Sequence, residues 1–265
     1  MLIINWFYYA YAISIDCPTL LDFSSGLGIQ SRQPLIWNQL QIDCCLTSGV
    51  TCIGQRVTRI FWDSMSLNGS INGSINGSAL PATLEVLSLT YNQLFGVIPQ
   101  ILPTSLTELL IWNNGLSGNI PTWPAGILKL DVSHNKLTGS LPVSPEGLNY
   151  LHVHDNMLSG DLPTFSSSVN DLWLNPNYFT GTLRLNKPVS LYINDNWITN
   201  VIILDTSALT TCDLSENPLL GSPTISNLTI CTKIGLYNAS DIRIDCPNMI
   251  NFAFGLGIQS RQPLI

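Results

Sequence analysis

The sequence predicts an α/β repeat solenoid in which every coil contributes one short strand to a parallel sheet. One observation is a recurring frame with apolar residues at positions 1, 4 and 6, Asn at position 9, an apolar residue at 11 and Gly at 13. Another is its spacing, since copies begin at Leu84, Leu106, Ile127, Leu148 and Val169, a period of about 21 residues. A Pro closes several copies, which suits an extended return path better than a helix.

The clearest copy of the frame, ILKLDVSHNKLTGSLP, runs from Ile127 to Pro142. Positions 4 and 6 alternate as in a strand, so both side chains are expected to point inward. The Asn at position 9 is expected to turn its amide to backbone groups, because buried backbone polar groups need partners. No coil buries its apolar edge alone, so we expect neighbouring coils to stabilise one another.

We divide the chain into a signal peptide (1–15), a cap (16–56), about nine coils of roughly 21 residues (57–244) and a duplicated, truncated cap-like segment (245–265). Residues 1–15 are apolar and uncharged, and Ala10-Tyr11-Ala12 has the small-x-small form of a signal-peptidase site. We therefore expect an extracellular protein. The alternative for this segment is an apolar edge that packs on the cap. The segment is shorter than the roughly 20 residues of a membrane span, and we expect no span elsewhere.

Glycosylation sequons support secretion. Single N-x-S/T matches are weak in an Asn-rich chain, but several beside a signal-like start are informative. They are Asn68, Asn72, Asn76, Asn227 and Asn238. The first three sequons lie in a repeated NGSI run. The alternative is that this run arose by replication slippage, which added a loop to the first coil.

The cap carries a specific family resemblance. It is carried by Cys17, the LLDF run, Trp37, the adjacent Cys44 and Cys45, and the ending Gly49-Val50-Thr51-Cys52. These features resemble the N-terminal cap of plant-type leucine-rich-repeat proteins, such as polygalacturonase-inhibiting proteins and receptor-like kinase ectodomains. The L-x-G-x-I/L-P ending of the repeats is similar too, so the resemblance extends from Asp16 to about Ala239.

This resemblance implies a leucine-rich-repeat right-handed superhelix with a concave parallel β-sheet and a disulfide-stapled N-terminal cap. It also implies a short cap helix, a Trp packed on the first coil, and disulfides Cys17–Cys44 and Cys45–Cys52. A solenoid end exposes its core, so a stapled cover is physically reasonable. Two features depart from the family: the repeats are shorter than usual, and Leu46-Thr47-Ser48 stands where the family has Trp.

The C-terminal segment copies the cap, since residues 255–265 are identical to residues 26–36. We interpret it as a truncated tandem duplication; the alternative is a reused C-terminal cover. The chain has 7 cysteines, so at least one stays unpaired within it. We expect Cys212 to be a buried small hydrophobe, and Cys231–Cys246 is a plausible C-terminal disulfide.

Strand positions 3, 5 and 7 point away from the core onto the concave sheet face. Large aromatic residues there are not needed for folding and suggest a contact surface, while the acids favour a basic or polar partner. The alternative is ring stacking that stabilises the sheet. The candidate ligand-binding residues are Phe61, Asp63, Glu108, Trp112, Asp131, Tyr150, His152, His154, Asp171, Trp173, Tyr192 and Asp213.

The histidines His134, His152 and His154 fall near the middle of this face. His152 and His154, with Asp131 or Asp171 nearby, could hold a metal or sense pH. We adopt the alternative, solvated polar residues on a binding face, and assign no metal and no cofactor.

The function predicted from these features is recognition. We expect a secreted protein that binds a protein, peptide or glycan ligand through its concave face; the family resemblance makes an extracellular hydrolase or a peptide the candidate target. The formal net charge of -7 argues against a nucleic-acid partner. We expect no enzyme, because an open regular sheet rarely encloses a cleft. The alternatives are a structural or adhesive repeat protein without one ligand and, remotely, a glycan-active enzyme.

Overall fold

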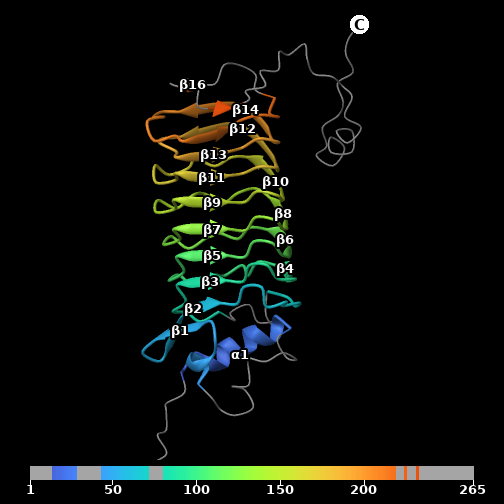
Figure 1. Ribbon diagram of the computed structural model, residues 1–265, viewed down its shortest axis with the longest axis vertical. Helices are drawn as coiled ribbons and strands as arrows, with labels where there is room; N and C mark the ends of the chain where they lie inside the picture. The colour runs from blue at the N-terminus through green and yellow to red at the C-terminus, as the bar shows by residue number, and fades with distance from the viewer. Residues whose placement is uncertain (1–13, 29–42, 72–79, 219–223, 226–230, 233–265) are drawn as a thin grey trace, which may run out of the picture.

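The chain winds into an elongated solenoid with a small helical cap at its N-terminal end, as the computed structural model shows (Figure 1). The structure describes residues 14–28, 43–71, 80–218, 224–225 and 231–232. The signal-like start up to residue 13, Trp37, the sequons Asn72, Asn76, Asn227 and Asn238, and the segment 245–265 lie outside the described residues. No helix among the described residues is long and apolar enough to cross a membrane.

One sheet of ten strands follows the length of the solenoid, and all its neighbouring strands are parallel except the first pair. Its strands, in spatial order, are β1 (Val50–Ile53), β2 (Arg56–Phe61), β3 (Val86–Ser88), β5 (Glu108–Leu110), β7 (Lys129–Asp131), β9 (Tyr150–His152), β11 (Asp171–Trp173), β13 (Ser190–Tyr192), β15 (Thr211–Asp213) and β17 (Cys231–Thr232). The register pairs Leu109 with Leu130, Leu130 with Leu151, and Leu151 with Leu172. Frame position 4 therefore repeats in register, which confirms the stacked parallel strands.

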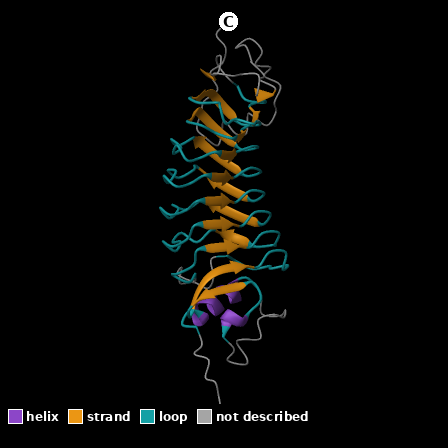
Figure 2. Cartoon of the chain, turned by 60° about the vertical axis from the view of Figure 1, so that its left-hand side comes forward, coloured by secondary structure: helices purple, strands orange, loops and turns teal. Residues whose placement is uncertain are grey.

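A second parallel sheet forms the opposite side of the solenoid (Figures 1 and 2). Its strands are β4 (Phe95–Val97), β6 (Gly115–Asn119), β8 (Lys136–Gly139), β10 (Met157–Asp161), β12 (Tyr178–Leu185), β14 (Trp197–Ile203) and β16 (Thr224–Ile225). The sequence predicted only an extended return path here. Within the described residues, helices occur only in the cap, and the coils that begin with β3 to β15 are each built from two strands and turns.

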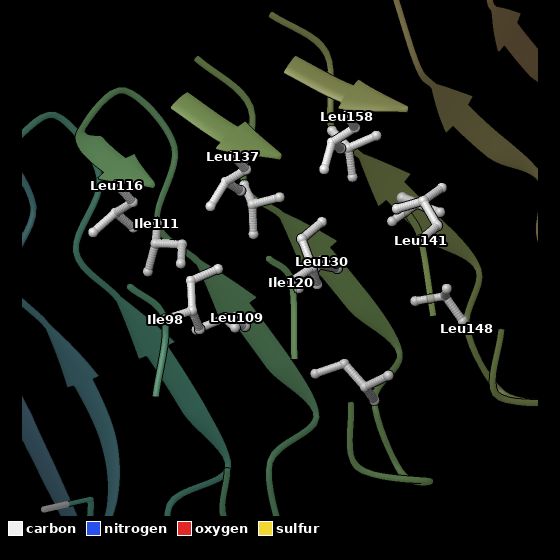
Figure 3. Packing of buried hydrophobic residues seen from close by; sticks show 14 of the residues in the cluster. Ile98, Leu109, Ile111, Leu116, Ile120, Leu130, Leu137, Leu141, Leu148 and Leu158 are labelled. Atoms are coloured by element: carbon white, nitrogen blue, oxygen red, sulfur yellow. The ribbon is translucent and has the colours of Figure 1, made fainter. Parts of the chain in front are cut away.

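The core lies between the two sheets and is made of the frame's apolar positions. Leu109 and Leu130 of the first sheet and Leu116 and Leu137 of the second are at most 2% exposed (Figure 3). The Gly at position 13 has a positive φ in several coils, and at Gly139 an added Cβ would stand 2.5 Å from Asn119 Oδ1. Glycine is therefore required at this bend by both its backbone conformation and the close approach of the preceding coil.

The Asn at position 9 turns its amide to backbone groups, as the sequence predicted, and it also links neighbouring coils. Asn156 shows the arrangement. Its Nδ2 donates to the carbonyl oxygens of Val132 and Val153, each at 3.0 Å, and its Oδ1 accepts a hydrogen bond of 2.9 Å from the Leu137 backbone N–H. The members of this Asn ladder are Asn92, Asn114, Asn135, Asn156, Asn177, Asn196 and Asn217. The ladder satisfies backbone groups that the turns leave unpaired.

The cap has the short helix α1 (Cys17–Gly26) and the 3-10 helix η2 (Cys44–Leu46), joined by the Cys17–Cys44 disulfide. A second disulfide joins Cys45 to Cys52, so both implied pairings are confirmed. Trp62 of the first coil stacks on Phe23 of α1 with 6.5 Å between ring centroids. The cap thereby covers the apolar end of the solenoid.

The predicted Cys231–Cys246 pairing is wrong, because Cys231 forms a disulfide with Cys212. These residues are partners in register on the adjacent parallel strands β15 and β17, with 4.4 Å between their Cα atoms. Cys212 is therefore bonded and not a free buried thiol. The sequence spacing placed Cys231 at frame position 1. Because Cys231 pairs in register with Cys212, which occupies position 4, Cys231 also occupies position 4.

Candidate ligand-binding surface

The outer side of the ten-stranded sheet, which we call the sheet face, carries all of the predicted ligand-binding residues. They lie on the strands or in the turn that directly follows each strand. Phe61 and Asp63 are exposed, Asp131 and His152 are buried, and the remaining residues are half-buried: Glu108, Trp112, Tyr150, His154, Asp171, Trp173, Tyr192 and Asp213. The frame thus placed these side chains on one surface, but it did not predict how deeply each one is buried.

Aromatic and imidazole rings form an unbroken row across the sheet face, which we call the ring ladder. Its centroid separations are 4.2 Å for Tyr91–Trp112, 6.3 Å for Trp112–His134, 4.8 Å for His134–His154, 5.4 Å for His154–Trp173 and 4.8 Å for Trp173–Tyr192. The sequence analysis placed His134 near the middle of this face but named neither His134 nor Tyr91 as a ligand-binding residue, because both occupy frame position 8, beyond the alternating positions 3, 5 and 7. That position has a left-handed backbone, with φ of 53° and 50°, which directs these rings back onto the sheet face.

His152 lies beneath this row as a buried, charge-flanked imidazole. Its ring stands 3.8 Å from the Tyr150 ring and 4.4 Å from the Trp173 ring, and the histidine is 6% exposed. Its Nε2 is 3.3 Å from Asp171 Oδ1, and its Nδ1 is 3.8 Å from Asp131 Oδ2. Two carboxylates and two aromatic rings therefore fix the position of this imidazole and stiffen the centre of the sheet face.

Several acids on the sheet face also have a local structural role. Asp131 Oδ1 accepts hydrogen bonds from the Ser133 backbone N–H and hydroxyl, and Asp213 Oδ1 does the same with Ser215. Asp63 Oδ1 accepts from the Ser88 hydroxyl and the Thr90 N–H of the next coil. Asp131 and Asp213 thus support the turn that leaves their own strand, and Asp63 joins its coil to the next. The sequence analysis missed these roles, although the Asp-x-Ser spacing indicates the first of them.

Burial and neighbouring charges alter the protonation of this surface. Burial raises the pKa of Tyr150 far above its usual value, and the negative charges of Asp131 and Asp171 raise it further. Burial lowers the pKa of His154, and the adjacent His134 adds to the effect. Burial alone would raise the pKa of Asp171, but the adjoining His152 lowers it overall. At neutral pH the surface therefore presents a neutral His154 and an ionised Asp171 beside the rings.

The resulting surface is suited to recognition. Flat rings offer apolar contact area at a small loss of conformational entropy, and the imidazoles and carboxylates at their edges can fix the orientation of a polar ligand.

Comparisons with known proteins agree with this architecture. Residues 83–104, 105–127 and 126–148 match the family Leucine Rich Repeat. The crystal structure of a Pollen Receptor Kinase 3 has a TM-score of 0.53 and 19% sequence identity, and the similarity covers 78% of this chain and 97% of that chain. A search of curated proteins found no significant match.

A second similar structure is the ectodomain of the plant membrane receptor kinase GASSHO1/SCHENGEN3 from Arabidopsis thaliana, in complex with CASPARIAN STRIP INTEGRITY FACTOR 2. It has a TM-score of 0.53 and 24% identity, and the similarity covers 77% of this chain and 33% of that chain. The present chain thus corresponds to about a third of that ectodomain's length. At these identities the comparisons show a shared fold.

Proposed function

We propose that this chain, whose repeats at residues 83–148 match the family Leucine Rich Repeat, is a plant-type recognition protein whose sheet face binds a peptide or a segment of another protein. The observation that carries the proposal is the ring ladder. The core is complete without it, since the apolar frame positions fill the space between the sheets. Rings that add nothing to that core, yet form a continuous row on one surface, are typical of a contact site.

The charge of the protein favours a basic ligand. The chain has a formal net charge of -7, and the half-buried Glu108 and Asp171 lie on the sheet face. Lysine or arginine side chains of a peptide would pair with these acids, and the same cations stack on aromatic rings. Binding should therefore weaken as salt concentration rises. The complex of the similar GASSHO1/SCHENGEN3 ectodomain supports ligand binding as a use of this architecture.

Substitutions within the ladder test the proposal against a control on the opposite sheet. Peptides selected on the wild-type protein from a displayed random-peptide library serve as the probe. Trp112→Ala and Trp173→Ala should each weaken binding about tenfold or more, as expected for an aromatic hot spot. Phe95→Ala is the control, because Phe95 is 51% exposed on the second sheet.

Unchanged peptide affinity in both tryptophan variants, or an equal loss in the control, would contradict the proposal. Thermal unfolding distinguishes the alternative in which the rings only stabilise the sheet. In that case the tryptophan variants lose stability, and those that fold keep full affinity. That outcome would indicate a structural or adhesive protein without one ligand. The ring contacts between neighbouring strands are the observation that favours this alternative.

A non-enzymatic role is part of the proposal. The nearest carboxylates that could act as a paired acid and base, Asp131 and Asp171, both face the buried His152, and Asp131 also accepts a hydrogen bond from the Ser133 hydroxyl. Hydrolysis of glycan substrates by the purified protein would contradict this part of the proposal.

We also propose that the protein is extracellular. Three disulfides among the described residues indicate an oxidising compartment, and Asn68 of the first sequon is exposed. Intact mass of the protein expressed in a secretory host tests this, with and without glycosidase and thiol alkylation. We expect N-glycans and six cysteines protected from alkylation by the three disulfides. A glycan-free chain with every thiol reactive would contradict it.

A further inference from the structure

Three metal-ligating groups meet at the middle of the ring ladder, on two adjacent coils. His134 follows strand β7, and His154 and Asp155 follow strand β9. One ligand atom from each residue lies within 4.8 Å of the other two. His134 Nδ1 is 3.0 Å from Asp155 Oδ2, and the His134 backbone N–H donates to the His154 carbonyl oxygen at 3.0 Å. The stacking of the coils therefore brings the three groups together.

We propose that His134, His154 and Asp155 form a binding site for a divalent transition metal, with Zn²⁺ as the reference ion. Two imidazoles and one carboxylate are a set of ligands that zinc accepts, whereas Ca²⁺ and Mg²⁺ prefer oxygen ligands alone. The protein supplies three ligands, so a fourth position remains for water or for a group of a bound ligand.

The observed separations suit this ion. Ligand atoms at about 2.1 Å from a tetrahedral zinc stand roughly 3.4 Å apart. The His134–Asp155 pair, at 3.0 Å, is already close to that separation. The remaining separations are at most 4.8 Å, and rotation about side-chain bonds can shorten them.

An ion pair between His134 and Asp155 alone would leave one feature unexplained. The Nδ1 atom of His154 is buried, and it has no hydrogen-bond partner among the described residues. A buried polar atom without a partner is unfavourable, and a metal ion bound through Nδ1 would supply that partner. His152 is excluded from the site because its two nitrogens face Asp131 and Asp171.

Zinc titration of the full-length protein tests the proposal, with a chromophoric chelator as competitor. We expect saturable binding that His154→Ala, His134→Asn and Asp155→Asn each weaken about tenfold or more, since even the groups that orient metal ligands alter affinity by that factor. Millimolar Mg²⁺ should not compete. His134 and Asp155 have left-handed backbones, which Asn adopts readily, so these two variants should keep the fold.

Asp195→Asn is the matched control, because Asp195 has the same frame position and a φ of 53° but lies on another coil. It should bind zinc as the wild type does. The tryptophan fluorescence of Trp112 and Trp173 gives a second readout, because their rings are 6.3 Å from His134 and 5.4 Å from His154. Ni²⁺ should quench this fluorescence in the wild type and less in His154→Ala.

Absence of saturable zinc binding would overturn the proposal. So would wild-type affinity, within about twofold, in all three ligand variants, since the ion would then be bound by other residues. Neither result bears on the proposed function, because peptide binding to the tryptophan variants is measured without added metal.

Discussion

Replacement of one member of the Asn ladder should destabilise the whole solenoid. Asn156 is 9% exposed, and its side chain joins backbone groups of two coils. In Asn156→Ala the two amide-to-carbonyl bonds at 3.0 Å are lost, at about 1 kcal/mol each. The Leu137 N–H also loses its acceptor, which costs about 2 kcal/mol for a buried donor. We therefore expect a loss of about 4 kcal/mol in the free energy of unfolding.

Equilibrium unfolding in urea measures this loss, because the stability of a domain is about 5 to 15 kcal/mol and the transition midpoint should fall substantially. Asn156→Asp should be no better tolerated, since it removes the amide donor and places a carboxylate against two carbonyl oxygens. The control is Asn149→Ala, because Asn149 is exposed in the same coil, and its effect should stay within about 0.5 kcal/mol. A loss below about 1 kcal/mol in Asn156→Ala would refute the inference that the ladder joins the coils.

Three further predictions concern the core, the disulfide of the last coil and the pH dependence of stability at acidic pH. Leu151→Ala, at a fully buried position, should lower the free energy of unfolding by about 2 to 5 kcal/mol in the urea assay; a loss under about 1 kcal/mol would contradict the packing. Cys231→Ser opens a disulfide that spans 19 residues, so unfolding should require about 3 kcal/mol less than in the wild type, and equal stability of the two proteins would count against the bond. The pKa of Asp171 is lowered in the folded protein, so the ionised carboxylate contributes stability above the unfolded value of 3.8, and this contribution disappears as the pH falls through the folded pKa. The stability difference between wild type and Asp171→Asn, measured in urea at pH 5 and at pH 2.5, should therefore shrink at the lower pH, and a constant difference would be inconsistent with the lowered pKa.

The repeat frame contained most of the information about the fold. Its period placed the parallel strands of the first sheet, and its Asn predicted a side chain that bonds backbone groups, as Asn156 does. The second sheet was not predicted, because Gly and Pro in the return path indicate only an extended chain. Pairing of those segments depends on how closely the coils approach, as at Gly139 and Asn119.

The repeat pattern predicted the wrong register for the last coil, because this register also depends on contacts between coils. Cys231, Ile234 and Leu236 have the spacing of positions 1, 4 and 6, but the strand pairs Cys231 with Cys212. A periodic pattern in one short coil cannot distinguish two starting points, whereas a bond to the neighbouring strand does.

The sequence predicted which residues lie on the sheet face, but it predicted only part of how those residues interact. Alternation along the strands identified Trp112, Trp173 and Tyr192 as outward-facing, and the structure places them there. The group of His134, His154 and Asp155 was missed, because it depends on the left-handed turn at position 8 rather than on alternation. Likewise, the burial of His152 comes from rings on its own strand and the next, which no local pattern encodes.

The most direct test of the central proposal is side-chain footprinting of the protein with and without a selected peptide. Carbene labelling read by mass spectrometry reports which side chains the peptide covers. We predict protection of Trp112, Trp173 and Tyr192 on the sheet face, with unchanged labelling of Phe95 and Tyr178 on the second sheet. Protection of the second sheet with an unprotected ring ladder would contradict the proposal that the ladder binds the ligand.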